Sequence, residues 1–199
     1  MIKSGNLSRY SAFFVYNECM EPKKTDRRKW IIPLLVIIGA IILALSLWQK
    51  PEPSPPEIRT AADLVYLENT EHFTEECVTH IFLGTLSAEG RASGYHYDGI
   101  EDSPGEIVEG SRSEPDEHGV YTAKVRVGGK GKAGNRGYST FYPDDFTPQQ
   151  VIDAINQAYE NKVLLSGTLY AGITEEGIEI DMALDEDGRI ITAYPVKEE

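Results

Sequence analysis

Cysteine is scarce in this chain of 199 residues, which contains only Cys19 and Cys77. The two cysteines lie on opposite sides of a long uncharged segment, residues 30–48. If that segment crosses a membrane, the two thiols cannot bond to each other within one chain. A disulfide framework is therefore excluded, and we expect packing to hold the core together.

Nucleotide-binding fingerprints, internal repeats and an excess of positive charge are missing as well. The sequence contains no Walker motif and no dinucleotide-binding motif, which argues against a nucleotide cofactor. From residue 59 onward, eleven Lys and Arg face 27 Asp and Glu. Such an acidic surface repels phosphates and excludes a broad, sequence-blind RNA or DNA coat protein.

The overall composition is that of a globular protein. Charged residues make up 26% of the chain and hydrophobic residues 41%, which is not the composition of a disordered protein. The length allows one ordinary domain with additional segments attached to it.

The first third of the chain predicts a membrane anchor. Residues 23–29 include five cations, and residues 30–48 follow without a charge and with tryptophan at both ends. A helix of this length rises ~28 Å, which matches the hydrocarbon core of a bilayer. The run is longer than the apolar region of a cleaved signal peptide. We therefore expect a single transmembrane helix over residues 30–48.

The charge distribution around this segment predicts its orientation. Cations precede it and acidic, proline-rich residues follow it, so residues 1–29 should form a cytoplasmic segment. Residues 49–58 contain four prolines and should form an extended linker. The expected location is thus the cell membrane, with a domain of residues 59–199 displayed outside.

Residues 59–199 predict an α+β domain. Helical patterns over residues 58–67 and from about residue 74 come first, and strands follow over residues 106–110, 120–127 and 139–142. Thr147 and Gln150 form a capping box around Pro148, which opens a helix with one apolar stripe. The tail is expected to be β, over residues 163–173, 178–184 and 189–194. Small helices followed by antiparallel sheet with one embedded helix make an α+β fold.

Two histidines within residues 77–99 are the candidate chemical groups. His80 should project from the end of a helix that Gly84 stops, and His96 lies in a glycine-flanked aromatic segment. Two imidazoles in one cleft can move two protons near neutral pH. Two other readings remain open: histidines that only bond to the backbone, and a zinc site built on Cys77-x-x-His80, which lacks a second ligand pair.

A basic segment stands out in the acidic domain. Between residues 120 and 139 there is no acidic residue, and five of the residues from 128 to 137 are glycine. Lys124 and Arg126 share the solvent face of the strand over 120–127, and the glycine-rich loop carries Lys130, Lys132 and Arg136. The segment is either an RNA-binding patch or a solvated hairpin tip.

Several separated segments resemble, in order, the bacterial EndoU nuclease domain over about residues 60–197. These segments are His80-Ile81-Phe82-x-Gly84, Ser93-Gly94-x-His96, Gly119-Val120-Tyr121-x-Ala123-Lys124-Val125, Ser139-Thr140-Phe141-Tyr142-Pro143, the helix over 151–161 and Gly188-Arg189-Ile190-Ile191-Thr192-Ala193-Tyr194-Pro195. The resemblance implies small helices joined to curved antiparallel sheets. It also implies a uridine-preferring endoribonuclease that leaves 2′,3′-cyclic phosphate ends.

The resemblance further implies roles for individual residues. Family members use two histidines, matched by His80 and His96, and a lysine whose position corresponds to Arg136. This arginine departs from the family pattern, because it stabilises charge but does not readily give up a proton. Lys124 is the alternative cation. The expected substrate-binding residues are Lys124, Ser139, Thr140, Thr192 and Tyr194.

The expected cofactors and partners follow from the same resemblance. No metal is required and no metal ligand is assigned, with Mn²⁺ as an optional addition. The expected partners are RNA, the membrane through one N-terminal helix, and an inhibitor or immunity protein if the domain acts as a toxin. The alternative is a non-catalytic, membrane-tethered domain that binds a partner protein outside the membrane.

Overall fold

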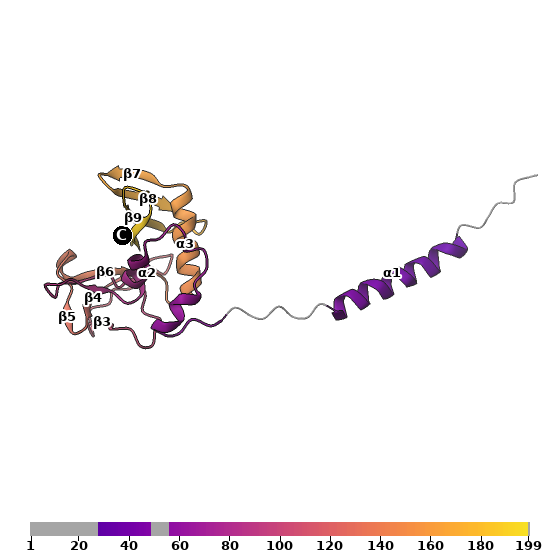
Figure 1. Cartoon of the computed structure of the whole chain (residues 1–199), viewed down its shortest axis with the longest axis horizontal. Coiled ribbons are helices and arrows are strands. Elements are labelled where there is room, and N and C mark those ends of the chain that lie inside the picture. The colour runs from indigo at the N-terminus through magenta and orange to yellow at the C-terminus, as the bar shows by residue number, and fades with distance from the viewer. Residues whose placement is uncertain (1–27, 49–55, 199) are drawn as a thin grey trace, which may run out of the picture. The chain divides into compact units, whose positions relative to one another are not determined.

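A computed structural model describes residues 28–48 and 56–198 (Figure 1). The chain divides into two compact units, residues 1–54 and 55–199, and each is described by itself. Most of the predicted N-terminal segment (residues 1–29) and of the predicted linker (residues 49–58) lies outside the described residues. The second unit contains all the predicted site residues.

Helix α1 spans Arg28–Trp48 and is the described part of the first unit. The predicted transmembrane helix falls on it. A spanning helix needs about 20 consecutive apolar residues. Within the described part of the chain, no helix combines the length and the apolar character needed to cross a membrane. The predicted span is therefore not supported. The predicted orientation across a membrane depended on it and stays an untested prediction.

The second unit has the expected α+β architecture, with short helices and antiparallel sheets. Its helical elements are η1 (Ala61–Tyr66), α2 (Glu75–Phe82), η2 (Asn135–Gly137) and α3 (Pro148–Glu160). Its strands are β1 (Thr85–Leu86), β2 (Ala92–Ser93), β3 (Gly105–Ile107), β4 (Tyr121–Val127), β5 (Lys130–Gly131), β6 (Tyr138–Phe141), β7 (Val163–Ser166), β8 (Leu169–Ile173), β9 (Glu179–Leu184) and β10 (Ile190–Pro195).

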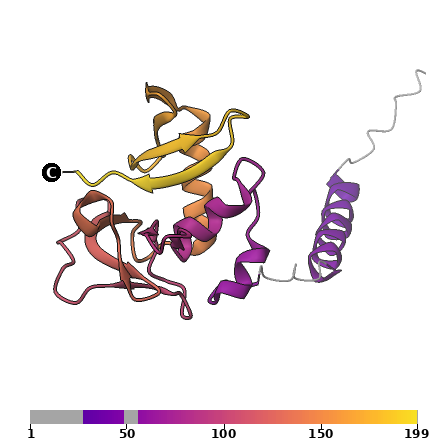
Figure 2. The same cartoon turned by 60° about the vertical axis from the view of Figure 1, so that its left-hand side comes forward.

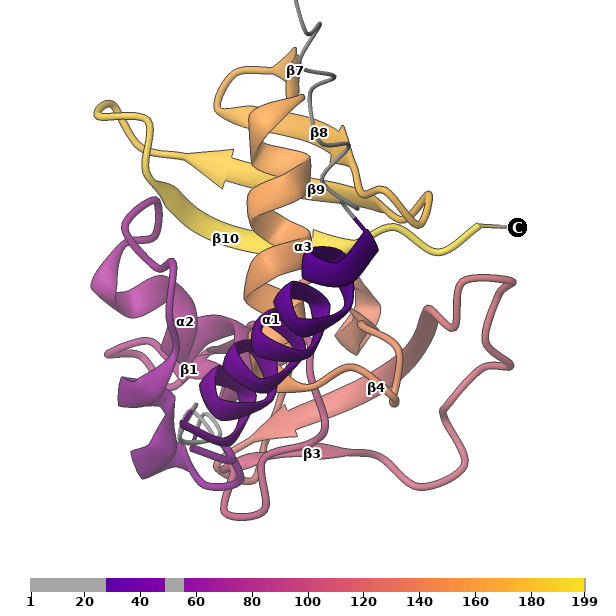
Figure 3. The ribbon, with the colours of Figure 1, turned by 90° about the vertical axis from the view of Figure 1, so that its right-hand side faces the viewer.

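The strands form two larger sheets and one small hairpin. Strands β7 to β10 make an antiparallel sheet in the order β10-β9-β8-β7. Strand β4 pairs with β3, β5 and β6, and β1 pairs with β2. Figure 2 shows the β7–β10 sheet in yellow and orange above the β3–β6 strands in salmon. Helix α2 packs against β10, and α3 crosses the β7–β10 sheet at β8 and β9 (Figure 3).

Helix α3 forms for the local reasons that the sequence indicates. The Gln150 amide N–H donates to the Thr147 hydroxyl (3.3 Å), and the Thr147 N–H donates to the Gln150 side-chain oxygen (2.8 Å). This capping box satisfies two amides that the helix cannot pair internally. Apolar residues of one stripe, such as Val151 and Ile155, are fully buried in the larger of the two core clusters.

Strand β4 alternates between core and solvent as its sequence predicts. Tyr121, Ala123 and Val125 are buried, whereas Lys124 and Arg126 are exposed. The buried side chains form a second, smaller core cluster that also includes Tyr95. This alternation fixes the face of the strand on which its two cations lie.

Three expected elements differ in detail from the structure, and the first is the strand expected over residues 106–110, which is the shorter β3 (Gly105–Ile107). The helix expected over residues 58–67 is the 3₁₀ helix η1, with no fully buried residue. The strand expected over residues 163–173 is a hairpin, since a turn of Gly167, at φ 54°, and Thr168 separates β7 from β8. A positive φ favours glycine and turns the chain back. Apolar residues continue on both sides of this turn, so the hydrophobicity pattern does not predict it.

Candidate active site

His80 lies in the last turn of α2, at the end of a short helix with one buried face. Cys77, Ile81 and Phe82 of this helix are buried in the core. The Leu83 N–H donates to the Thr79 carbonyl (2.9 Å), and Gly84 at φ 71° then turns the chain out of the helix. The half-buried His80 is thereby held on a rigid element, as the sequence predicts.

The segment that carries His96 pairs with the end of α2. The Tyr95 N–H donates to the carbonyl of His80 (2.9 Å), and the His96 N–H donates to the carbonyl of Ile81 (2.8 Å). These two bonds bring the imidazoles together, with ring centroids 6.3 Å apart. The Ser-Gly-x-His pattern thus places the second histidine beside the first through backbone pairing.

A pocket of about 340 Å³ opens beside the two histidines. Six of the eight residues predicted as catalytic or substrate-binding line it: His80, His96, Ser139, Thr140, Thr192 and Tyr194. Ser93, Lys132, Asn135 and Tyr138 also line it, although none of them is among the eight predicted residues. The pocket therefore combines residues from α2, β6, β10 and the glycine-rich loop.

Lys132 supplies the positive charge in this pocket. Its Nζ donates to the Ser139 hydroxyl (2.7 Å) and to the Gly94 carbonyl (3.3 Å). The Ser139 hydroxyl in turn donates to the same carbonyl (2.9 Å). Burial lowers the pKa of Lys132 to about 8, because a partly desolvated ammonium is less stable. The group is therefore positioned and still largely charged at pH 7.

The two predicted cations, Arg136 and Lys124, do not line the pocket. Arg136 is exposed and has φ 53°, in the left-handed region. Lys124 is exposed on β4, and its Nζ lies 5.5 Å from the ring centroid of Tyr138.

Backbone pairing explains why Lys132 faces inward. The Lys132 N–H donates to the Val125 carbonyl (3.0 Å), and residue 132 forms a parallel bridge with Ala92. The loop is thus bound on both sides. The high number of glycines predicts that the loop is flexible, and it cannot reveal these two backbone contacts. In the sequence, Lys132 is marked only by its place in the basic, glycine-rich loop.

His96 is almost completely buried, at 4% exposure. Its Nδ1 lies 2.8 Å from the carbonyl oxygen of Thr140. A carbonyl only accepts hydrogen bonds, so Nδ1 carries a proton and Nε2 has the free lone pair of the neutral ring. Burial, together with the charge of Lys132, holds the pKa of His96 well below its usual value. His96 is therefore a neutral base at pH 7.

His80 and Tyr194 complete the immediate surroundings of His96. Burial, followed by the charge of Lys132, lowers the pKa of His80 to about 4. The Tyr194 ring stacks on the His96 ring, with centroids 5.4 Å apart and planes inclined by 20°. The aromatic ring of Tyr194 therefore forms one wall of the site.

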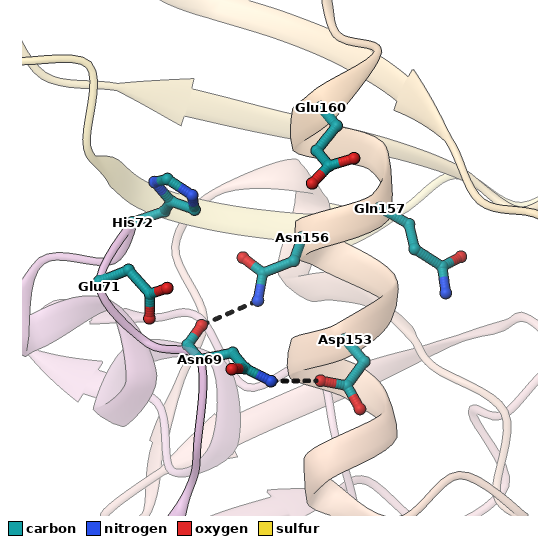
Figure 4. Close-up of a pocket in the computed structure, with 7 residues that line it drawn as sticks. All are labelled: Asn69, Glu71, His72, Asp153, Asn156, Gln157 and Glu160. Atoms are coloured by element: carbon teal, nitrogen blue, oxygen red, sulfur yellow. Dashed lines mark hydrogen bonds between the residues drawn. The ribbon is translucent and has the colours of Figure 1, made fainter.

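A second pocket, of about 330 Å³, lies beside α3 (Figure 4). Its lining includes the carboxylates of Glu71, Asp153 and Glu160. The Asn156 amide donates to the carbonyl of Asn69 (2.8 Å) across it. Three carboxylates repel a phosphate, so this pocket is unsuited to an RNA backbone. The chemistry favours the pocket with the two histidines and Lys132.

Candidate metal ligands among the described residues lie elsewhere. Glu117, His118 and Glu198 place one ligand atom each within 4.8 Å of one another, and none of them lines the histidine pocket. The zinc reading of Cys77-x-x-His80 is unfavourable, because Cys77 is fully buried and burial raises its thiol pKa to about 12. Zinc binds the thiolate, which this environment disfavours. A role for Mn²⁺ stays an untested prediction.

Comparison with known proteins agrees with the resemblance seen in the sequence. Residues 74–197 match the family model described as bacterial EndoU nuclease. A protein named "Toxin" from Bacillus cereus is 43% identical over 131 residues, which cover 66% of this chain but only 24% of that relative. No solved structure matches the chain. Since the family model covers more than half of the sequence, the chain belongs to the bacterial EndoU nuclease family.

Proposed function

We propose that this chain is a toxin-like endoribonuclease that cleaves RNA, preferentially after uridine, and leaves a 2′,3′-cyclic phosphate. The observation that carries the proposal is the convergence of His80, His96 and the ammonium of Lys132 on one pocket. RNA cleavage by its own 2′-hydroxyl needs a base, an acid and a cation on the phosphate oxygens. The two imidazoles and the ammonium group can supply the base, the acid and the cation.

His96 is the proposed base. Its Nε2 takes the proton of the 2′-hydroxyl while the 2′-oxygen forms a bond to phosphorus. The tautomer required is the one that the Thr140 carbonyl favours, with the proton on Nδ1. A positioned base of this kind contributes roughly 10²–10⁴ in rate.

Lys132 and His80 are proposed to act on the phosphate and the leaving group. The Lys132 ammonium stabilises the negative charge that builds up on the non-bridging oxygens. His80 gives a proton to the 5′-oxygen as its bond to phosphorus breaks. The incoming phosphodiester brings a negative charge beside His80, and such a charge raises the pKa of an imidazole and favours its protonated form.

Uridine preference is proposed to come from three further residues that line the pocket. Tyr194 offers an aromatic face, and Thr192 and Thr140 offer hydroxyl groups. Single-stranded RNA is recognised by stacking of unpaired bases and by hydrogen bonds to their edges. A small pyrimidine with two carbonyls and one N–H suits hydroxyls that both donate and accept.

The toxin role rests on the Bacillus cereus relative, which is named "Toxin". The aligned region is about a quarter of that relative, so its role is transferred here only as a proposal. A toxin that cleaves RNA requires protection of the producing cell. We therefore propose an inhibitor protein as the macromolecular partner, with RNA as the substrate.

The test uses the purified full chain and an oligoribonucleotide with a single uridine. We expect cleavage on the 3′ side of the uridine, with a cyclic phosphate on one product and a free 5′-hydroxyl on the other. An oligonucleotide with 2′-deoxyuridine at that position should remain intact, because it lacks the attacking hydroxyl. Mass spectrometry of the products identifies the ends.

Two further arms decide between the remaining possibilities. Parallel reactions with EDTA and with added Mn²⁺ test metal dependence directly. His96→Ala should lose at least ~10²-fold in rate, because the base is removed. If the wild-type chain binds RNA or a partner protein but cleaves nothing, the non-catalytic binding domain is the better description.

A further inference from the structure

A pair of hydroxyl groups lies behind His80, on the side of the ring away from its Nε2. Strands β1 and β2 pair antiparallel immediately after α2, with Thr85 opposite Ser93. The Thr85 Oγ1 lies 3.0 Å from His80 Nδ1 and 3.0 Å from the Ser93 Oγ. The three polar groups therefore form a continuous hydrogen-bonded chain. All three residues are only partly exposed to solvent.

The two histidines thus differ in the partner of Nδ1. His96 faces the Thr140 carbonyl, which accepts and never donates. His80 faces the Thr85 hydroxyl, which can do either. A ring held by a carbonyl keeps one tautomer, whereas a ring held by a hydroxyl can exchange its proton without losing its partner.

We propose that the Thr85–Ser93 hydroxyl pair positions His80 and satisfies its Nδ1 whether the ring is doubly protonated or neutral, in either neutral tautomer. This inference rests on the ribonuclease function proposed above. When His80 is doubly protonated, Nδ1–H donates to Thr85, and the Thr85 hydroxyl turns towards Ser93. When Nδ1 is unprotonated, Ser93 donates to Thr85, and Thr85 donates to Nδ1.

The hairpin itself offers a reason for this arrangement. Facing residues in an antiparallel pair bring their side chains to the same side of the strands, so both hydroxyls point towards α2. Gly94 follows Ser93, and a Cβ at Gly94 would lie 2.9 Å from Cγ and Nδ1 of His80. The ring is therefore confined on the Gly94 side by packing, and the Thr85 hydroxyl fixes its rotation.

Loss of the hydroxyl should affect turnover more than substrate binding. Thr85→Val keeps the shape of the side chain but leaves Nδ1 without its protein partner. An unpaired polar group in this half-buried position corresponds to roughly a tenfold to hundredfold effect. We expect kcat to fall by that factor with KM little changed, because Thr85 does not line the pocket. Thr85→Ser retains a hydroxyl and should stay close to wild type.

The experiment combines kinetics with ¹⁵N NMR of the histidine side chains in the full chain. The ¹⁵N shifts of His80 report its tautomer and its titration. Lys132 and His96 are the neighbouring titratable groups that affect this titration. Thr85→Val should change these shifts, and Thr85→Ser should not. Ser93→Ala should lower kcat several-fold and change the His80 shifts in the same direction.

The outcomes separate this inference from the proposed function. If wild type fails to cleave RNA, the ribonuclease proposal falls, and the catalytic role of the hydroxyl pair falls with it. If wild type cleaves, either full kcat in Thr85→Val or an equal loss in Thr85→Ser overturns the hydroxyl pair alone. Should Thr85→Val fail to fold, Ser93→Ala decides, since unchanged His80 shifts in that variant also overturn the inference.

Discussion

Gly94 and His80 lie so close together that a side chain at position 94 has no room. A Cβ on Gly94 would lie 2.2 Å from the carbonyl oxygen of His80 and 2.9 Å from Cγ and Nδ1 of its ring. Gly94 also has φ 76°, where side chains are strained. The glycine of the Ser-Gly-x-His pattern is therefore a packing requirement of the site.

Gly94→Ala should displace His80 and abolish most of the activity. The added methyl group collides with backbone as well as ring, so the last turn of α2 must shift, and a shift of ~1 Å can cost ~10²-fold in rate. Gly90→Ala is the matched control, because Gly90 has nearly the same φ, 74°, with nothing within 4 Å of its Cβ position. Oligonucleotide cleavage and urea unfolding measure both effects. Equal activity in the two variants would contradict this role of Gly94.

Lys132→Ala should lower kcat by roughly 10²–10³-fold, because it removes the charge that we propose stabilises the transition state. Arg136→Ala is the matched control, since it removes an equal charge from the same loop at an exposed position. It should change the rate by less than about threefold and only weaken the salt dependence of RNA binding. A large loss in Arg136→Ala with an active Lys132→Ala would show that the position first aligned with the family lysine is the functional one.

Activity should decline as the pH rises through about 8. The pKa of Lys132 is lowered to about 8 by burial, so its positive charge is present below that pH and lost above it. The measurement is kcat/KM between pH 6 and 10, which reports groups of the free enzyme. The residual activity of Lys132→Arg should lack this decline, because guanidinium stays charged. An unchanged alkaline limb in that variant would assign the titration to another group.

The buried histidines should make the fold less stable in mild acid. The pKa of His80 is about 4 in the folded protein and ~6.5 in an unfolded chain. Between these values the unfolded state binds the proton and the folded state does not, so stability falls as the pH falls from 6.5 towards 4. From pH 7 to 5, His80 contributes a loss of ~2 kcal/mol.

Urea unfolding of wild type and of His80→Ala at both pH values measures this contribution. The free energy of unfolding should depend less on pH in the variant, by about that amount. His96, whose pKa is also lowered, adds to the pH dependence that remains. Identical pH dependence in the two proteins would mean that folding does not lower the pKa of His80.

Local sequence patterns determined much of the local structure of this protein. The capping box at Thr147 and the alternation along β4 depend on neighbours a few residues away, and both predict the structure closely. The helix that presents His80 and the ordered segments of the nuclease family were recognisable for the same reason. Six of the eight site residues that were predicted from the sequence line one pocket in the structure.

The tertiary structure alone decided which cation enters the site. Lys130, Lys132 and Arg136 share one glycine-rich loop without hydrophobic periodicity, so nothing local indicates which way each side chain points. Pairing with β4 and the bridge at Ala92 turn Lys132 inward, towards Ser139. Such contacts join residues far apart in the chain, and their energy depends on the assembled fold. The direction in which each side chain of this loop points is therefore set by the packing of the whole domain.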